Sequence, residues 1–155
     1  MLKITQTAAD FTLPCDNGTE ITLSQLRPAA VVLFFYPRDD TPGCTLEARD
    51  FTQWLPKFKA LGAEVYGISK DSLVKHGKFR DKFDLTVPLL SDENSDVCEN
   101  YGVWVEKKMY GKTFMGISRS TVLIDGAGKI ARIWPKVKVA GHAQEVYESL
   151  LNLPK

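Results

Sequence analysis

Residues 34–51, FFYPRDDTPGCTLEARDF, hold the boundary between an apolar strand and a helix that opens with a cysteine. The run AAVVLFFYP (29–37) is apolar without alternation, which is typical of a strand buried on both faces. After a polar loop, apolar residues recur every three or four positions, as on one face of a helix. They predict a helix over residues 42–61, ended by Gly62. Its apolar face consists of Cys44, Ala48, Phe51, Leu55 and Phe58.

Strands and helices alternate on the C-terminal side of this unit. Two further buried strands are predicted at 63–69 and 87–91, with a helix at 71–83 between them and a short helix at 94–101 after them. Hairpins are predicted at both ends, one closed at Asn17-Gly18 and one over residues 119–135, before a final amphipathic helix at 140–153. The order predicts an α/β fold in which a central mixed β-sheet is flanked by helices, with an N-terminal β-hairpin.

Length and composition indicate one soluble globular domain over residues 1–155. The net charge of +1 gives no electrostatic reason to expect nucleic acid or an anionic membrane as a partner. The N-terminal MLKITQTAADF lacks the apolar core of a signal peptide, and the run AAVVLFFY is too short to span a bilayer. We therefore expect a cytoplasmic protein. The basic pair Lys107-Lys108 is expected to be solvated surface.

The three cysteines, Cys15, Cys44 and Cys98, are too few and too scattered for a disulfide framework, so reduced thiols are expected. Their spacing from the histidines does not suit zinc, and no metal or organic cofactor is expected. His76 and His142 are isolated in the sequence, and this favours surface or capping roles over metal ligation.

Cys44 occupies a special place in the predicted helix. Thr41 is a good N-cap and Pro42 suits the first helical position, so Cys44 becomes the third helical residue. Backbone N–H groups are unpaired there, and the helix dipole favours negative charge. A sulfur in this position should ionise more easily than a free thiol. The alternative is that Cys44 is a small and inert core residue, because it opens the apolar face of its helix.

The stretch YPRDDTPGCTLEARDF resembles the active-site segment of peroxiredoxins, in which proline, threonine and cysteine are spaced as Pro37, Thr41 and Cys44 are here. WVEKKMYGKTFMGISRSTVLID resembles the Q type, or bacterioferritin comigratory protein class, and the resemblance covers nearly the whole chain. It implies a thioredoxin-like fold and thiol-dependent reduction of hydrogen peroxide and organic hydroperoxides by Cys44, in antioxidant defence. It also implies that Arg119, in ISRST, completes the site. Monomers are common in this type.

The chemistry of peroxide reduction explains these residue types. A thiolate attacks one peroxide oxygen, and negative charge grows on the oxygen that leaves. Arg119 would stabilise both charges as a cation that keeps its proton. The hydroxyl of Thr41 can accept one hydrogen bond and donate another, so it can orient the peroxide. Pro37 would fix the loop and shield the thiolate, and Cys44 would become a sulfenic acid.

Two alternatives from other functional classes are a thioredoxin-like disulfide oxidoreductase and a redox-inert binding module with the same fold. The first needs two cysteines two residues apart at the helix start, but Thr41 occupies the place of the first one. The second requires a Cys44 that does not react with peroxide.

How the sulfenic acid is reduced follows less directly from the sequence. Many Q-type relatives carry a resolving cysteine five residues after the first, where this chain has Arg49. Others carry it in the helix that corresponds to residues 71–83, which has no cysteine here. Cys98 is a possible resolving cysteine, but Val97, Cys98 and Tyr101 form a small apolar face that should pack inward. We therefore predict a one-cysteine cycle in which thioredoxin, glutaredoxin or a small thiol restores Cys44.

Overall fold

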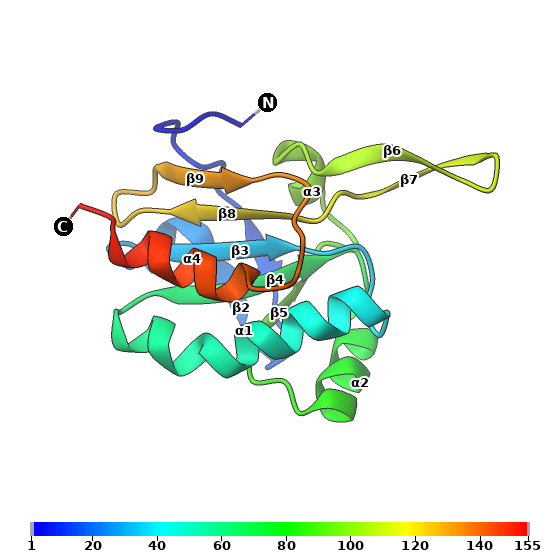
Figure 1. The fold of residues 1–155 in the computed structure, drawn as a ribbon, viewed down its shortest axis with the longest axis horizontal. Coiled ribbons are helices and arrows are strands. Elements are labelled where there is room, and N and C mark those ends of the chain that lie inside the picture. Colours follow the sequence, from blue (N-terminus) through cyan, green and yellow to red (C-terminus); the bar gives the residue numbers. More distant parts are fainter. Residues whose placement is uncertain (1, 155) are drawn as a thin grey trace.

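The computed structural model describes residues 2–154, and a five-stranded mixed sheet forms its centre (Figure 1). The strand order is β5-β4-β3-β8-β9. Three strands run parallel: β3 (Val31–Phe35), β4 (Glu64–Ser69) and β5 (Leu89–Ser91). Two run antiparallel on the other side of β3: β8 (Ser120–Ile124) and β9 (Ile130–Trp134). The predicted mixed sheet is confirmed, and so is the second hairpin.

β3 lies in the middle of the sheet and has hydrogen-bonded neighbours on both sides, β4 and β8. Its five side chains are all buried, as the unbroken apolar run predicts. Val31, Leu33 and Phe35 belong to one hydrophobic core, whereas Val32 and Phe34 belong to the other. The sheet thus separates two hydrophobic cores. The core to which a residue belongs therefore shows on which face of the sheet it lies.

The long helices cover one face of the sheet (Figure 1). They are α1 (Pro42–Ala60), α2 (Leu73–Phe83) and α4 (His142–Leu151). The predicted apolar face of α1 is buried along its whole length, and the Phe51 ring stacks on Phe34 of β3 with centroids 4.4 Å apart. α4 packs beside α1, where the rings of Trp54 and Tyr147 lie 5.4 Å apart.

Short elements cover the opposite face. They are β1 (Thr12–Pro14), β2 (Glu20–Thr22), the 3-10 helix η1 (Leu23–Leu26) and α3 (Val97–Asn100). β1 and β2 pair antiparallel, which confirms the N-terminal hairpin. Cys15 and Cys98 are buried in this second core, so the inward packing predicted for Cys98 is confirmed.

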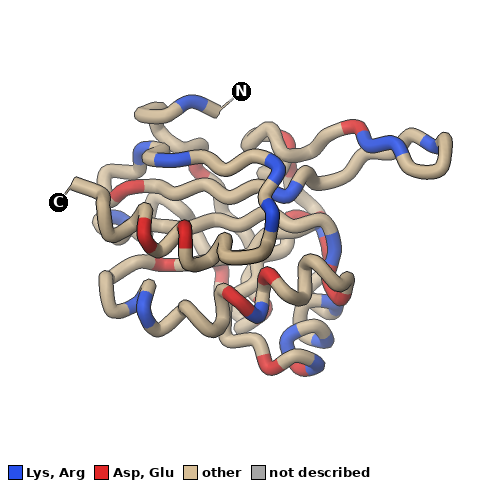
Figure 2. Tube along the Cα trace, in the orientation of Figure 1, with Lys and Arg blue, Asp and Glu red and all other residues tan. Residues whose placement is uncertain are grey.

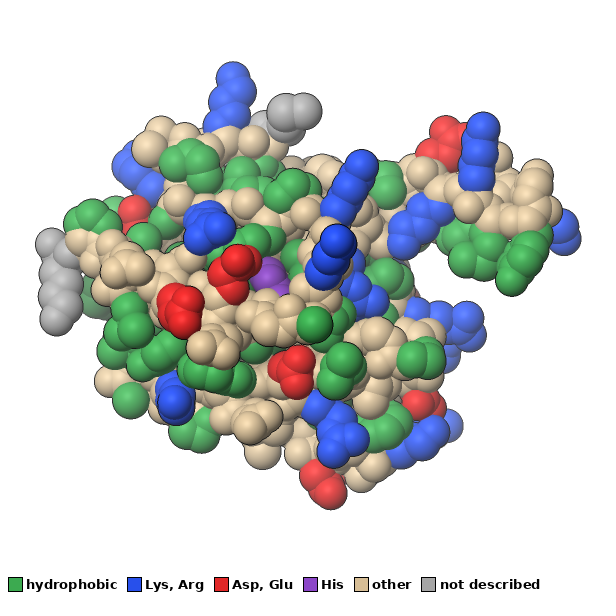
Figure 3. All heavy atoms as spheres, in the orientation of Figure 1, with side chains coloured by type: hydrophobic (Ala, Val, Ile, Leu, Met, Phe, Trp, Pro, Cys, Tyr) green, Lys and Arg blue, Asp and Glu red, His purple; other side chains and the backbone are tan. Residues whose placement is uncertain are grey.

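The sequence pattern did not predict the ribbon formed by β6 (Trp104–Met109) and β7 (Lys112–Ile117), here called the arm. It projects from the body of the protein (Figure 1). Tyr110 and Gly111 both have positive φ, as a two-residue type I′ hairpin turn requires. Both faces of the outer half of the arm are exposed to solvent. Its polar and apolar residues therefore do not alternate as they do in a half-buried strand. Exposed hydrophobic side chains lie on the arm (Figure 3), among them Met109, Phe114 and Met115.

Charges of both signs are distributed over the fold, and basic residues recur on the arm and around α2 (Figure 2). This mixture agrees with the small net charge of the chain. Within residues 2–154, none of the helices has the length and apolar character needed to cross a membrane.

Two glycine-to-alanine substitutions test the packing of the sheet. Gly67 lies on β4 where an added Cβ would come 2.6 Å from Cζ of Phe34, so Gly67→Ala should lower the free energy of unfolding by about 1–3 kcal/mol through overpacking. Gly77 lies inside α2 with no atom within 4 Å of an added Cβ, and Gly77→Ala should raise stability by about 0.5–1 kcal/mol. Urea unfolding measures both changes. Equal effects of the two substitutions would contradict this account.

Candidate active site

Cys44 lies where the central strand β3 passes through a short loop into α1. Thr41 has the extended backbone of an N-cap, Pro42 begins the helix, and Cys44 is its third residue. The first intrahelical bond is donated by the N–H of Thr45 to the carbonyl of Thr41, at 2.8 Å. The sulfur therefore lies in the first turn, at the positive end of the helix and at the carboxyl edge of a parallel strand. Its side chain is buried.

Arg119 reaches this sulfur from the segment between β7 and β8. Its Nη2 donates to Sγ of Cys44 at 3.3 Å, which places a fixed cation against the thiol. The guanidinium also lies against Gly43, where an added Cβ would be 3.1 Å from Nη2. Glycine in the first turn thus leaves room for the arginine. The structure brings together two of the four residues singled out in the sequence, although they are 75 positions apart.

Glu47 was not recognised in the sequence as a site residue. Its Oε1 accepts from Nη1 of Arg119 at 2.7 Å, so one guanidinium bridges Glu47 and Cys44. Burial raises the pKa of Glu47 to about 7, although Arg119 acts in the opposite direction. Its other oxygen, Oε2, is buried and has no hydrogen-bond partner within residues 2–154. The available signal was an acidic residue three positions after Cys44, on the apolar face of the helix.

Pro37 and Thr41 lie in the loop that leads into α1. Pro37 is half-buried and follows Tyr36, the first residue after β3. Thr41 takes the N-cap position, but its side chain makes no capping hydrogen bond and instead donates from Oγ1 to the carbonyl of Arg38 at 2.9 Å. Because the hydroxyl hydrogen is used within the loop, the lone pairs of Oγ1 remain to accept hydrogen bonds.

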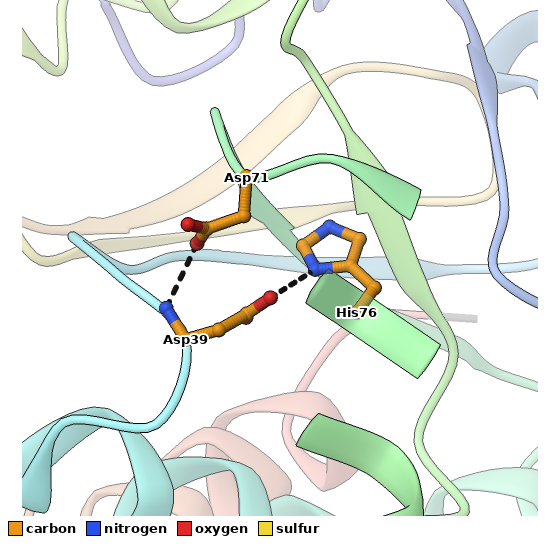
Figure 4. Close-up of side chains that lie close together, drawn as sticks. All are labelled: Asp39, Asp71 and His76. Carbon is orange, nitrogen blue, oxygen red and sulfur yellow. Dashed lines mark hydrogen bonds and ion pairs between the residues drawn. The ribbon is translucent and has the colours of Figure 1, made fainter. Parts of the chain in front are cut away.

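Buried polar residues under the loop hold it in place (Figure 4). Asp39 accepts from the hydroxyl of Tyr36 at 2.6 Å, and its backbone N–H donates to Asp71 at 2.8 Å. Its second oxygen lies 2.6 Å from Nδ1 of His76. These contacts correct the expectation that His76 lies at the surface or caps a helix: its side chain is fully buried.

His142 is also buried, against the same expectation, with its Nε2 2.8 Å from the hydroxyl of Thr121. Burial lowers its pKa to about 4, so it is neutral.

Ligand atoms of Asp39, Asp71 and His76 lie within 4.8 Å of one another, as in a metal site. However, these atoms already serve as hydrogen-bond partners of each other and of the loop, and a cation would displace those bonds.

The expectation that Lys107 is solvated is also corrected. This residue on β6 is half-buried, and burial lowers its pKa. The charge of Arg119 acts in the same direction, whereas Cys44 opposes it, so Lys107 lies within electrostatic reach of the site.

The sheet separates Cys44 from the other two thiols. Cys44 lies in the core under α1, whereas Cys15 and Cys98 lie in the core on the opposite face. Burial raises the pKa of both Cys15 and Cys98, and in Cys98 the neighbouring Asp92 adds to this effect. Both therefore remain protonated and unreactive near neutral pH.

Comparisons with known proteins agree with this geometry. Residues 4–133 match the AhpC/TSA family. The chain is 48% identical to a putative peroxiredoxin bcp of Coxiella burnetii, over 94% of this chain and 96% of that protein. It is 43% identical to the peroxiredoxin Bcp of Bacillus subtilis, over 98% and 97%. A bacterioferritin comigratory protein of Xanthomonas campestris, studied for alkyl peroxide reduction, superposes with a TM-score of 0.88 at 40% identity over 97% and 96% of the two chains.

Glu47 should make stability depend on pH. Its carboxyl binds a proton more tightly in the folded protein, where its pKa is about 7, than in the unfolded chain, where it is near 4.5. The folded state is therefore favoured at low pH, and this contribution is lost as the pH rises from about 4.5 through 7. Relative to Glu47→Gln, the wild type should lose up to about 3 kcal/mol of unfolding free energy across this window. Urea unfolding at pH 5 and pH 8 measures the difference, and parallel behaviour of the two proteins would refute it.

Proposed function

This chain belongs to the AhpC/TSA family as a thiol-dependent peroxidase of the peroxiredoxin Q type, and we propose that Cys44 is the residue that reduces its hydroperoxide substrates. The observation that carries the assignment is the 3.3 Å contact between Nη2 of Arg119 and the Cys44 sulfur. Cys15 and Cys98 lie on the other face of the sheet, away from any helix start of comparable length.

The reaction begins when the Cys44 thiolate attacks one oxygen of the peroxide. The S–O bond forms as the O–O bond breaks, and the leaving oxygen takes up a proton to become an alcohol, or water when the substrate is hydrogen peroxide. Cys44 is oxidised to a sulfenic acid while the peroxide is reduced. The first-turn N–H groups and the guanidinium of Arg119 stabilise the negative charge as it moves from sulfur to oxygen.

The remaining site residues orient the peroxide. The hydroxyl of Thr41 donates to the Arg38 carbonyl, so its oxygen can accept the O–H of the substrate and hold the peroxide in line with the sulfur. Glu47 accepts a hydrogen bond from Nη1 of Arg119 and keeps the guanidinium in one orientation. Pro37 stiffens the loop and limits access to the sulfur, which slows over-oxidation.

A one-cysteine cycle is supported by the positions of the thiols. A disulfide needs Cα atoms within about 7 Å, and the sheet lies between Cys44 and Cys98. An external thiol would attack the sulfenic sulfur and release water, and a second thiol would then free Cys44 as the mixed disulfide is exchanged. Because Cys44 is only 1% exposed, a protein reductant can reach it only after the loop or the first turn opens.

Thioredoxin, glutaredoxin or a small thiol would serve as the reductant, and these thiols are kept reduced in the cytoplasm. We propose that the protein acts there as a monomer. Alkyl hydroperoxides are proposed as substrates beside hydrogen peroxide, because the similar Xanthomonas campestris protein is described for alkyl peroxide reduction.

Cys44→Ser tests the assignment of the peroxidatic residue. Serine keeps the shape of the side chain but cannot form a reactive thiolate, so peroxide consumption should fall to the background rate. Circular dichroism and urea unfolding should show an intact fold. The matched control is Cys15→Ser, on the opposite face of the sheet, which should keep peroxide turnover. A folded Cys44→Ser protein that still turns over peroxide would refute the proposal.

Cys98→Ser tests the one-cysteine cycle. Turnover with an external thiol should persist in this variant. In the wild type, one equivalent of peroxide without added thiol should give a sulfenic acid on Cys44, which dimedone traps and peptide mass spectrometry locates. If a Cys44–Cys98 disulfide peptide were the main product and Cys98→Ser lost turnover, Cys98 would be the resolving cysteine.

A further inference from the structure

His76 and Asp39 contact each other beneath the catalytic loop (Figure 4). Nε2 of His76 faces the carbonyl of Leu90 at 2.9 Å, and a carbonyl only accepts, so this nitrogen carries a hydrogen. Nδ1 lies 2.6 Å from Oδ2 of Asp39. A hydrogen bond at this distance needs a proton between the two atoms, whether it belongs to the imidazole or to the carboxyl. Without that proton, a carboxylate oxygen and a ring lone pair would repel each other in a buried place.

This proton stabilises a loop whose backbone is strained. Asp40 has a φ of +59°, in the left-handed region that residues other than glycine rarely adopt. Such a conformation persists only when its surroundings determine it. The hydrogen bond from Thr41 to the Arg38 carbonyl closes the turn on one side of Asp40. Asp39 anchors it on the other side through Tyr36, Asp71 and His76.

We propose that His76 is a positioning residue for peroxide reduction, which holds the loop of residues 37–41 in its reactive shape through the proton that it shares with Asp39. His76 does not touch the sulfur. It acts from α2 through Asp39, and the backbone between Asp39 and Cys44 passes through Thr41 at the start of α1. The inference rests on the proposed roles of Cys44 and Thr41.

The surroundings of His76 favour the shared proton. The titratable groups that face it are Tyr36 and Asp39 in the segment after β3, Asp71 in the segment after β4, and Lys75 on α2 itself. Burial opposes protonation, but the bonds to Asp39 and Leu90 and the charge of Asp71 outweigh it, and the pKa of His76 is raised. Lys75, 4.0 Å from Asp71 and mostly exposed, opposes this weakly. The positioning effect is thus present below the raised pKa of His76 and is lost as the pH rises through it.

The experiment compares two reactions of the same sulfur. Stopped-flow measurement gives the rate constant of reduced enzyme with hydrogen peroxide, which depends on the loop. Alkylation by iodoacetamide reports the reactivity of the Cys44 thiolate, which depends on Arg119 and the helix start. His76→Gln should lower the peroxide rate constant at least about tenfold, because a misplacement of reacting groups by about 1 Å can lower a rate about 10²-fold. The rate of alkylation should change less than about twofold. His142→Gln, at the other buried histidine, should leave both rates unchanged.

The pH dependence of the wild type provides a test that requires no variant to fold. The peroxide rate should fall as the pH rises through the raised pKa of His76, while alkylation does not fall. A downfield NMR resonance of the shared proton should disappear over the same pH range. His76→Gln should lack this fall in the peroxide rate, and this separates the effect of His76 from that of Lys107. Parallel losses of peroxide reduction and alkylation in His76→Gln would overturn the proposal, as would a resonance that titrates apart from the rate. A wild type whose Cys44 is still alkylated after peroxide treatment would contradict the proposed function itself, and this inference with it.

Discussion

The arrangement of the site depends on one guanidinium that donates hydrogen bonds to two acceptors, a sulfur and a carboxyl oxygen. Nη2 of Arg119 meets the Cys44 sulfur and Nη1 meets the Glu47 carboxyl, so the cation is aimed by an acid that the substrate does not need to touch. Each group lies on a rigid part of the fold: the sulfur and the carboxyl one turn apart on α1, and the arginine directly before β8. Because β3 pairs with β8 along its whole length, the helix start and the arginine are held in register by the sheet. The chemistry thus relies on backbone pairing and on Gly43, which leaves room for the close approach.

The central sheet also places the three thiols in different surroundings. Its central strand sends alternate side chains into two separate cores, and the three cysteines divide between them. Cys44 lies at the start of the long helix α1, whereas Cys15 and Cys98 lie in the core covered by short elements, with no comparable helix start. Burial keeps these two thiols protonated, so the fold protects them by placement. In the proposed one-cysteine cycle, this architecture depends on an external thiol, unlike enzymes with paired cysteines at the same helix.

The features that the sequence predicted are those that depend on local pattern. The unbroken apolar run at 29–37 and the spacing of Cys44, Ala48 and Phe51 gave the central strand, the first helix and the position of the sulfur. The arm was missed because a ribbon exposed on both faces shows no alternation. Glu47 and His76 were missed for another reason: their partners lie 72 and 37 positions away, and only tertiary packing brings these groups together. For Glu47, the one available signal was a polar residue on an apolar helix face. His76 was expected at the surface or at a helix cap because its buried partner, Asp39, could not be recognised from the sequence.

The arm has a mechanical consequence for the site. A two-stranded ribbon with little packing of its own is among the least stable parts of a fold, whereas β8 belongs to the most protected sheet. Only Ser118 and Arg119 separate the last residue of β7 from the first residue of β8. The guanidinium is therefore carried at the boundary between a mostly exposed strand and a fully buried one. Local unfolding that begins in the arm would therefore reach Arg119 before it reaches the central sheet.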